Sequence, residues 1–517
     1  MKRLLIISVV AAIAFSNCGC KKFLNINPQS DLSGNNFWRT RADVERYVNG
    51  LYELFRESVF RKDMTSPPGT DDLPFFAWAG DMRGAPVVQN PYADRPYISA
   101  LASNNVKTVV YSLPSGYSTY FVAIRFAQWD RFFKLVASAN IAVDRIPSVS
   151  DPALSDADKK RYKAEAIFLR NLAYFFMVRQ WGDIPYYTQP YFDGKLAREN
   201  QVSVLNKCLN DLGAIEQDLP WTYSDPTLIA VRGMRGSAIV LMMHINMWLA
   251  GFDAANAQTY YANTDKLANE LLTQNNGAYQ LLPLSQTKII FKGRSKEGLF
   301  EIPQNVNYGE SFGYCQFSDN VLYAPYKHYT ITNSYLSYQP AFMQKIFPQG
   351  QPDLRATTWY DPSNMYSGGN KFIMYKFANV YANQNAEDVN PDDNQTVFRL
   401  PDVYLLQAEA LYNMGKEDSA RAAMNVVRAR AQATPITSSV TGNDLNDAIF
   451  YERCREFMGE GLYWYDVVRT RRIVKADYGF GYHCTVSQFA AGAWTWPLDG
   501  STVQAGNPLI TLNNYWQ

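Results

Sequence analysis

Hydrophobic residues repeat at helical spacing along much of the chain. From about Asn36, and then over 129–273 and 402–472, apolar side chains recur every three or four positions, which is typical of amphipathic helices. Two long stretches, 65–120 and 280–400, lack this period and are rich in Pro, Gly and aromatic residues. The pattern predicts a mainly α-helical protein that carries long irregular segments, with one strand-like run, Gly298–Ile302.

Local signals define one helix more closely. Ser155 followed by Asp158 is a capping pair that predicts a helix start, and Gly182 predicts the helix end after Trp181. The apolar side chains expected to face the core from this helix are Leu169, Leu172, Ala173 and Phe176.

Small residues mark a second feature of the helical segments. The segment 408–422 places alanines where two antiparallel helices would touch, with Gly415 at the turn between them. This arrangement resembles a tetratricopeptide unit, and Ala250–Ala254 indicates a second turn of the same kind. Because no strict 34-residue period is present, the repeats would be degenerate, and an ordinary helical hairpin is the alternative.

The first twenty residues have the features of an export signal. A basic start precedes an apolar run over 4–15 that is too short to span a bilayer. The run ends in Ser-Asn-Cys-Gly-Cys, which resembles the acylation site of bacterial lipoproteins. The small residue Gly19 favours lipidation at Cys20 after removal of residues 1–19, and Cys18 is the alternative. We expect 20–35 to form a lipidated tether and 36–517 to form a single body.

Composition excludes one class of partner. The 517-residue chain has 49 basic and 48 acidic side chains, and removal of the signal leaves 47 and 48. A nearly neutral protein lacks the basic face that nucleic-acid binding requires. Aromatic residues make up 15% of the chain, which is ample material for a binding surface.

Cofactor and metal motifs are missing from the sequence. The three histidines are not spaced as metal ligands, and no phosphate-binding glycine motif or CxxC pair occurs. The segment Asp388–Asn394 alternates oxygen ligands as calcium loops do, but Pro391 interrupts it and Arg399 stands where Glu is needed. We therefore expect a solvated acidic loop and no cofactor. Disulfides remain possible among Cys208, Cys315, Cys454 and Cys484.

The aromatic residues of the irregular segments are the candidates for ligand contacts. A sugar needs a flat apolar platform beside planar hydrogen-bonding groups, and these segments contain both. The predicted contacts are Trp78, Asp81, Arg83, Tyr314, Trp359 and Tyr360. For each of the aromatic side chains, packing within a long loop is the competing interpretation.

Several blocks in order resemble the SusD/RagB family. They are spread along nearly the whole chain: Cys20–Leu24, Phe37–Trp38, Ala166–Tyr186, Arg399–Ala410, Tyr451–Gly461, Trp496–Leu498 and Asn513–Tyr515. The resemblance implies a degenerate tetratricopeptide-like helical array with loop-rich ligand-binding insertions. It also implies a lipoprotein on the outer membrane of Bacteroidetes-type bacteria that binds oligosaccharides, or peptides in the RagB branch. Its partner would be a TonB-dependent SusC-type β-barrel transporter, and the family is not catalytic.

Charged residues on two predicted helices allow either catalytic or structural roles. Glu456 and Glu460 are four residues apart, as a pair of catalytic carboxylates could be. Arg453 and Arg455 beside them favour structural ion pairs instead. Arg170 and Arg179, on the helix that ends near Trp181, are expected to need carboxylate partners. A polymer-degrading hydrolase and a structural scaffold remain as alternatives to a binding protein.

Overall fold

Helices dominate the computed structural model of the chain. The model describes residues 37–60, 73–113, 122–304, 316–326, 331–380 and 393–517. The predicted signal, the tether and Cys20 lie outside these residues.

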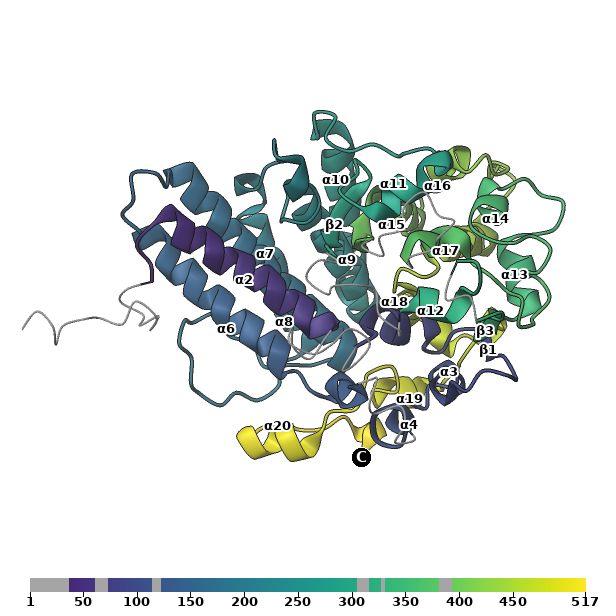
Figure 1. The fold of residues 1–517 in the computed structure, drawn as a ribbon, viewed down its shortest axis with the longest axis horizontal. Helices are drawn as coiled ribbons and strands as arrows, with labels where there is room; N and C mark the ends of the chain where they lie inside the picture. Colours follow the sequence, from purple (N-terminus) through teal and green to yellow (C-terminus); the bar gives the residue numbers. More distant parts are fainter. Residues whose placement is uncertain (1–36, 61–72, 114–121, 305–315, 327–330, 381–392) are drawn as a thin grey trace, which may run out of the picture.

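The N-terminal part of the body is a set of long packed helices. α2 packs on α6 and α7, and these three lie side by side at one end of the molecule (Figure 1). α8 packs against both α7 and α9, and α9 packs against α10, which follows it after a 119° bend. The bounds are α2 Arg41–Val59, α6 Asp130–Arg145, α7 Asp156–Trp181, α8 Gln201–Gly213, α9 Arg235–Phe252 and α10 Ala257–Gln274.

The array continues near the C-terminus. α15 packs against α9, α10, α16 and α17, so the two sequence-distant helical regions form one layer. Gly415 has a φ of +75° at the turn between α15 and α16, and Ala408 and Ala420 are fully buried. The predicted close helix pair is therefore confirmed. The bounds are α15 Leu400–Asn413, α16 Glu417–Arg430, α17 Gly442–Phe457 and α18 Tyr463–Arg469.

Short elements fill the stretches that the sequence predicted as irregular. Besides a π-helical segment, Phe76–Met82, these stretches hold α3 Pro96–Ala102, α4 Val106–Tyr111, α11 Thr287–Lys292, α12 Phe317–Val321, α13 Pro340–Ile346 and α14 Leu354–Thr358. α19 Val486–Ala490 and α20 Gly500–Gly506 follow near the C-terminus. These short helices escaped prediction because each has too few turns to show a period.

Two small antiparallel sheets tie distant segments together. β1 (Val87–Gln89) pairs with β3 (Leu336–Tyr338), with Val87 opposite Tyr338. β2 (Gly298–Ile302) is the predicted strand, and it pairs irregularly with β4 (Gln395–Arg399). Every residue of β2 and β4 is buried, so this pair lies inside the body.

The central helix α7 is more buried than its predicted stripe. Its side chains from Ala164 to Trp181 are all buried, so the helix is enclosed on every side. Ser155 accepts a hydrogen bond from the backbone N–H of Asp158 at 3.1 Å, and Gly182 ends the helix with a φ of +77°, as predicted.

The two arginines of α7 have different surroundings. Arg170 pairs with Asp211 at 2.6 Å, as expected. Arg179 instead lies over the rings of Phe175, Phe176 and Tyr465, with its guanidinium carbon 4.2 to 4.5 Å from their centroids. The predicted carboxylate partner of Arg179 is therefore wrong, because aromatic faces surround this cation.

Other expectations concern cysteines and membrane spans. Cys208, Cys454 and Cys484 are buried free thiols, and Cys315 lies outside the described residues. Among the described helices, no single one has the length and hydrophobicity to cross a membrane. The bent pair α9 and α10 passes that test only when taken together, across a 119° bend, and α9 is almost wholly buried.

Candidate functional site

The residues predicted as ligand contacts lie in the core wherever the structure describes them. Trp78 is fully buried, and its ring centroid lies 4.8 Å from that of Tyr97 and 5.8 Å from that of Phe126. Asp81 accepts a hydrogen bond from the backbone N–H of Gly461 at 2.7 Å, and burial raises the pKa of its carboxyl. Both residues hold the π-helical segment against its neighbours.

Arg83 is enclosed in the same region. Its guanidinium carbon lies 4.3 Å from the ring centroid of Trp464 and 5.1 Å from that of Trp496. It donates to the carbonyl oxygen of Thr495 at 2.8 Å and to the side chain of Asn104 at 2.9 Å. Burial lowers the pKa of Arg83 to about 9. The side chain therefore joins the C-terminal segment to the core.

Trp359 and Tyr360 are also fully buried. The indole N–H of Trp359 donates to the hydroxyl of Thr287 at 3.0 Å, and Lys376 lies 4.6 Å above its ring. The hydroxyl of Tyr360 contacts the sulfur of Met458 at 3.1 Å.

These positions require a correction to the predicted site. A ring with no exposed face cannot stack on a sugar, and a buried charge cannot meet a sugar's hydroxyls. In the described conformation the five residues Trp78, Asp81, Arg83, Trp359 and Tyr360 have packing roles. The aromatic-rich segments pass through the core, a path that the sequence did not indicate. Tyr314 lies outside the described residues, and its role stays a prediction.

Three partly exposed tyrosines form the best candidate surface. Tyr323 and Tyr326 follow α12, and Tyr375 begins the segment Tyr375–Val380; we call these three residues the tyrosine surface. The ring centroids of Tyr326 and Tyr375 are 5.0 Å apart. Hydrogen bonds hold the backbone at two of these residues: the N–H of Tyr326 donates to the carbonyl of Tyr323, and that of Tyr375 donates to the carbonyl of Trp359.

Charged groups border the tyrosine surface. Lys371 lies 5.4 Å from the ring centroid of Tyr323, whose hydroxyl donates to the Lys371 carbonyl at 3.1 Å. Burial, followed by Tyr326 and then Asp361, raises the pKa of Tyr375 to about 12. The phenol of Tyr375 therefore stays neutral at physiological pH and can both donate and accept hydrogen bonds.

A second group of aromatic residues, Tyr335 and Tyr92, lies in other segments of the same polypeptide. The guanidinium carbon of Arg95 is 4.3 Å from the ring centroid of Tyr335. The side chain of Lys371 donates to the carbonyl of Thr332, three residues before Tyr335, at 2.7 Å. Tyr92, in the turn after β1, is 85% exposed. Flat aromatic rings beside hydrogen-bonding side chains are an arrangement that can bind sugars noncovalently.

The sequence prediction missed these tyrosines. Their available signal was the run Tyr323-Ala-Pro-Tyr326, in which a proline turn is flanked by aromatic residues. Only exposed rings can contact a ligand. Which rings are exposed depends on tertiary contacts that the sequence does not display.

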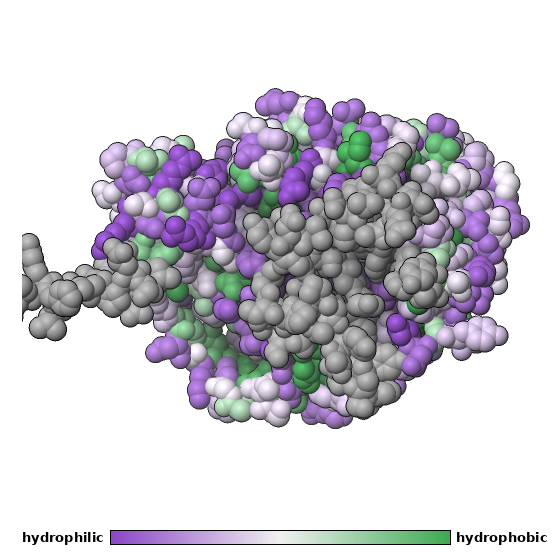
Figure 2. All heavy atoms as spheres, in the orientation of Figure 1, coloured by the Kyte–Doolittle hydropathy of each residue, from purple (hydrophilic) through white to green (hydrophobic). Residues whose placement is uncertain are grey.

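The rest of the visible surface is mainly polar. Figure 2 shows hydrophilic and intermediate residues over most of the described part of one face, with hydrophobic residues in small separate groups. Large hydrophobic side chains that are exposed, such as Tyr111 and Tyr191, are scattered along the described chain. This face therefore offers no broad apolar area among its described residues.

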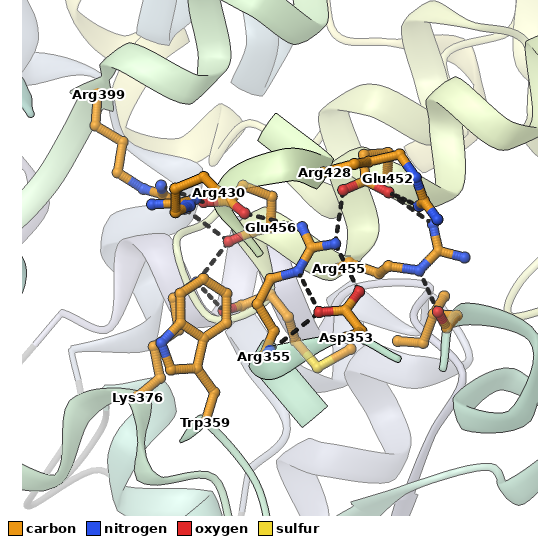
Figure 3. A network of polar contacts seen from close by, with 12 residues as sticks. Asp353, Arg355, Trp359, Lys376, Arg399, Arg428, Arg430, Glu452, Arg455 and Glu456 are labelled. Carbon is orange, nitrogen blue, oxygen red and sulfur yellow. Dashed lines mark hydrogen bonds and ion pairs between the residues drawn. The ribbon is translucent and has the colours of Figure 1, made fainter. Parts of the chain in front are cut away.

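A buried ionic network lies between α14, α16 and α17 (Figure 3). Glu456 pairs with Arg355 at 2.9 Å, with Arg399 at 2.5 Å, and with Arg430. Glu460 pairs with Lys376 and Arg399. The predicted structural role of these two carboxylates is confirmed, since their side chains are 0% and 3% exposed.

The partners within the network differ from those predicted. Arg455 pairs with Glu452 at 3.0 Å, and Arg453 pairs with Asp402 at 2.6 Å and with Asp466 at 2.8 Å. Neighbours along a helix point to different sides, so Arg453 and Arg455 cannot both face Glu456.

Catalytic and metal chemistry has few candidates among the described residues. His244 and Asp402 form a buried pair at 2.5 Å, and burial lowers the pKa of His244. His244 and Asp402 are both buried, so this pair has no exposed face that a substrate could reach. Within the described ranges, no group of three His, Cys, Asp or Glu side chains could hold a metal ion. Most of the Asp388–Asn394 loop lies outside those ranges.

Comparisons with known proteins identify the family. A model described as "SusD family" matches residues 327–496, and one described as "Starch-binding associating with outer membrane" matches residues 22–233. A crystallised SusD homologue of Bacteroides thetaiotaomicron is 37% identical, with a TM-score of 0.80 over 92% of this chain and 98% of its own. The chain belongs to the SusD/RagB family, whose members are binding proteins.

More distant relatives agree. The SusD-like protein P38 of Formosa agariphila is 25% identical over 88% of this chain and 89% of its own length. A laminarin-binding SusD-like protein of known structure is 20% identical, with a TM-score of 0.64 over 92% of this chain and 99% of its own. At 20% identity, the similarity to the laminarin-binding protein concerns the fold alone.

Proposed function

We propose that this protein captures oligosaccharides at the cell surface and delivers them to a TonB-dependent SusC-type transporter. The observation that carries the proposal is the tyrosine surface, Tyr323, Tyr326 and Tyr375, on a chain of the SusD/RagB family. Partly exposed phenol rings supply flat faces for sugar rings, and Lys371 and Asp361 supply polar partners for hydroxyls. Binding by this surface needs no covalent chemistry, so we infer a binding protein and not an enzyme.

The location follows from the sequence and the family. We propose cleavage after Gly19, acylation of Cys20, and anchoring in the outer membrane with the body exposed at the surface. A lipoprotein carries more than one acyl chain, and two chains anchor stably where one does not. A tether over 20–35 would keep the body close to a transporter in the same membrane, at a high local concentration.

A binding screen tests the proposal. The chain from Lys21 onward, without its lipid, is applied to an array of neutral and acidic glycans and to a panel of oligopeptides. We expect selective glycan binding in the micromolar range or tighter. Selective binding of oligopeptides would assign the protein to the peptide-binding RagB type. Release of shortened products from any polymer would support a hydrolase, and the absence of any binding would support a scaffold.

The proposed partner is tested separately. Purification from mild detergent through a C-terminal tag should recover a much larger β-barrel protein with this chain. Recovery of the chain alone under several detergents, together with normal growth of a deletion strain on the bound glycan, would refute the partnership.

A further inference from the structure

A groove of about 510 Å³ lies over one end of the buried ionic network. Its volume is within the range of about 300–1,000 Å³ that is usual for small-molecule sites. Loop 347–353, between α13 and α14, forms one wall, and the end of α16 forms another. The polar side chains that line it are Gln349, Gln351, Asp353, Thr357, Tyr366, Arg428, Gln432 and Arg455.

Two arginines of the groove share one carboxylate. Arg428 and Arg455 donate to the same oxygen of Glu452, at 2.5 and 3.0 Å. Arg355 contacts the other oxygen of Glu452 at 2.7 Å and also pairs with Asp353 at 2.7 Å. Figure 3 shows these side chains together with Glu456, which also pairs with Arg355 at 2.9 Å. Arg355 therefore links the groove to the rest of the network.

The network as a whole has one more cation than carboxylate. Its ion pairs join six cations, Arg355, Lys376, Arg399, Arg428, Arg430 and Arg455, to five carboxylates, Glu297, Asp353, Glu452, Glu456 and Glu460. Of these cations, Arg428 and Arg455 line the groove. Burial lowers the pKa of Arg455, and the neighbouring cations Arg355 and Arg428 lower it further against the opposing effect of Glu452. A negative ligand would relieve this repulsion.

The exposure of the arginines limits how a ligand can approach. The side chains of Arg455 and Arg428 are 12% and 8% exposed, and Arg355 is not exposed. Both of the partly exposed arginines line the groove, and their small exposure suits a small planar anion in preference to a bulky one. Arginine binds carboxylates well in this way because its donors are planar and fixed.

We propose that this groove binds the carboxylate of an acidic sugar residue, a uronate, separately from the tyrosine surface. Arg455 and Arg428 face the carboxylate, while the amides of Gln349, Gln351 and Gln432 meet the ring hydroxyls. The hydroxyl of Tyr366 is already used in a bond to the carbonyl of Phe347 at 2.7 Å, so the tyrosine contributes its ring. The glutamine amides supply hydrogen-bonding groups for sugar hydroxyls, and apolar wall residues such as Phe347 and Pro362 supply surface for the face of a sugar ring.

Substitutions in the groove wall test the proposal without breaking the network. Gln351 and Thr357 are exposed, so Gln351→Glu and Thr357→Glu add negative charge beside the arginines while Glu452 keeps its partners. Gln344→Glu, an exposed change on α13 outside the groove, is the matched control. Circular dichroism melting should show the same fold in all variants.

Calorimetry of the full mature chain with tri-galacturonate gives the decisive comparison. We expect binding to wild type, an affinity about tenfold lower for the methyl ester, and an affinity at least about fivefold lower in the double wall variant. Raising the salt concentration should weaken binding because charge drives it. The control variant and Tyr326→Ala/Tyr375→Ala should keep the wild-type affinity for tri-galacturonate.

Four results would overturn the proposal: no binding of tri-galacturonate, equal binding of the ester, equal loss in the Gln344→Glu control, or loss only in the tyrosine variant. The last result would move the acidic sugar to the tyrosine surface. Binding of a tripeptide through its C-terminal carboxylate as tightly as tri-galacturonate would also reject the sugar assignment.

Discussion

Replacing Glu452 with Gln should strongly destabilise the fold at neutral pH. Gln keeps the size of the side chain but removes the charge that pairs with Arg355, Arg428 and Arg455. All four side chains are buried or nearly so, so the three guanidiniums would lose their shared anion without gaining water. Loss of one partner from a buried ion pair costs about 3–5 kcal/mol.

The pH dependence gives a second value for the same interaction. Burial alone would raise the pKa of Glu452, but Arg355, Arg455 and Arg428 outweigh it and lower the pKa to about 2, from 4.5. At about 1.4 kcal/mol per pH unit, the difference corresponds to about 3 kcal/mol of stability. Because the folded pKa is lowered, this stability is present above pH 4.5 and is lost as the pH falls toward 2.

Urea denaturation at several pH values measures the effect. At pH 7 the free energy of unfolding of Glu452→Gln should be about 3–5 kcal/mol below wild type. The difference in unfolding free energy between the two proteins should narrow from pH 4.5 downward. Below that pH the carboxylate of unfolded wild type is protonated, whereas the folded protein must keep it charged down to about pH 2. The control Asp418→Asn removes an exposed partner of Arg421 and should cost under about 1 kcal/mol. A loss below about 1 kcal/mol for Glu452→Gln, or one that does not change with pH, would refute the reasoning.

Three further predictions follow from burial, close packing and the leader. Trp359→Ala should lower the free energy of unfolding by about 3–5 kcal/mol, as for other buried aromatic residues, and a variant with unchanged melting would show that Trp359 is not part of the core. Gly80→Ala should prevent folding, because the added Cβ would lie 2.1 Å from the carbonyl oxygen of Gly461. The control Gly213→Ala has open space around the added Cβ and should express normally, so equal expression of the two variants would contradict this packing. Cys20→Ala should abolish labelling by fatty acid and release the protein from membranes, and labelling that persists would place the acylation elsewhere.

Long periodic segments could be predicted well from the sequence. α7 began at its cap, Ser155, and ended before Gly182 as expected, because capping and termination depend on local chemistry. The close packing of α15 and α16 followed from alanines and Gly415 for the same reason. The burial of every α7 side chain from Ala164 to Trp181 could not be predicted, since the polar residues suggested a free face and their partners are far along the chain.

The candidate site was the weaker part of the prediction. Trp78 and Trp359 were chosen because they lie in segments without helical period, yet both are enclosed by side chains from other elements. The sequence shows which residues are aromatic, but exposure is set by long-range packing. Tyr326 and Tyr375 illustrate the limit, because they are 49 positions apart in the chain and 5.0 Å apart in the structure.

The capture of sugars at the tyrosine surface is tested most directly by calorimetry with the best glycan from the array. Wild type is compared with Tyr326→Ala/Tyr375→Ala and with Tyr111→Ala, a control at an exposed tyrosine on α4. Loss of two stacking rings, each worth about 1 kcal/mol beyond buried area, should lower the affinity about tenfold or more while the control stays at wild-type affinity. Equal affinity of all three proteins for the glycan would contradict the assignment of this surface.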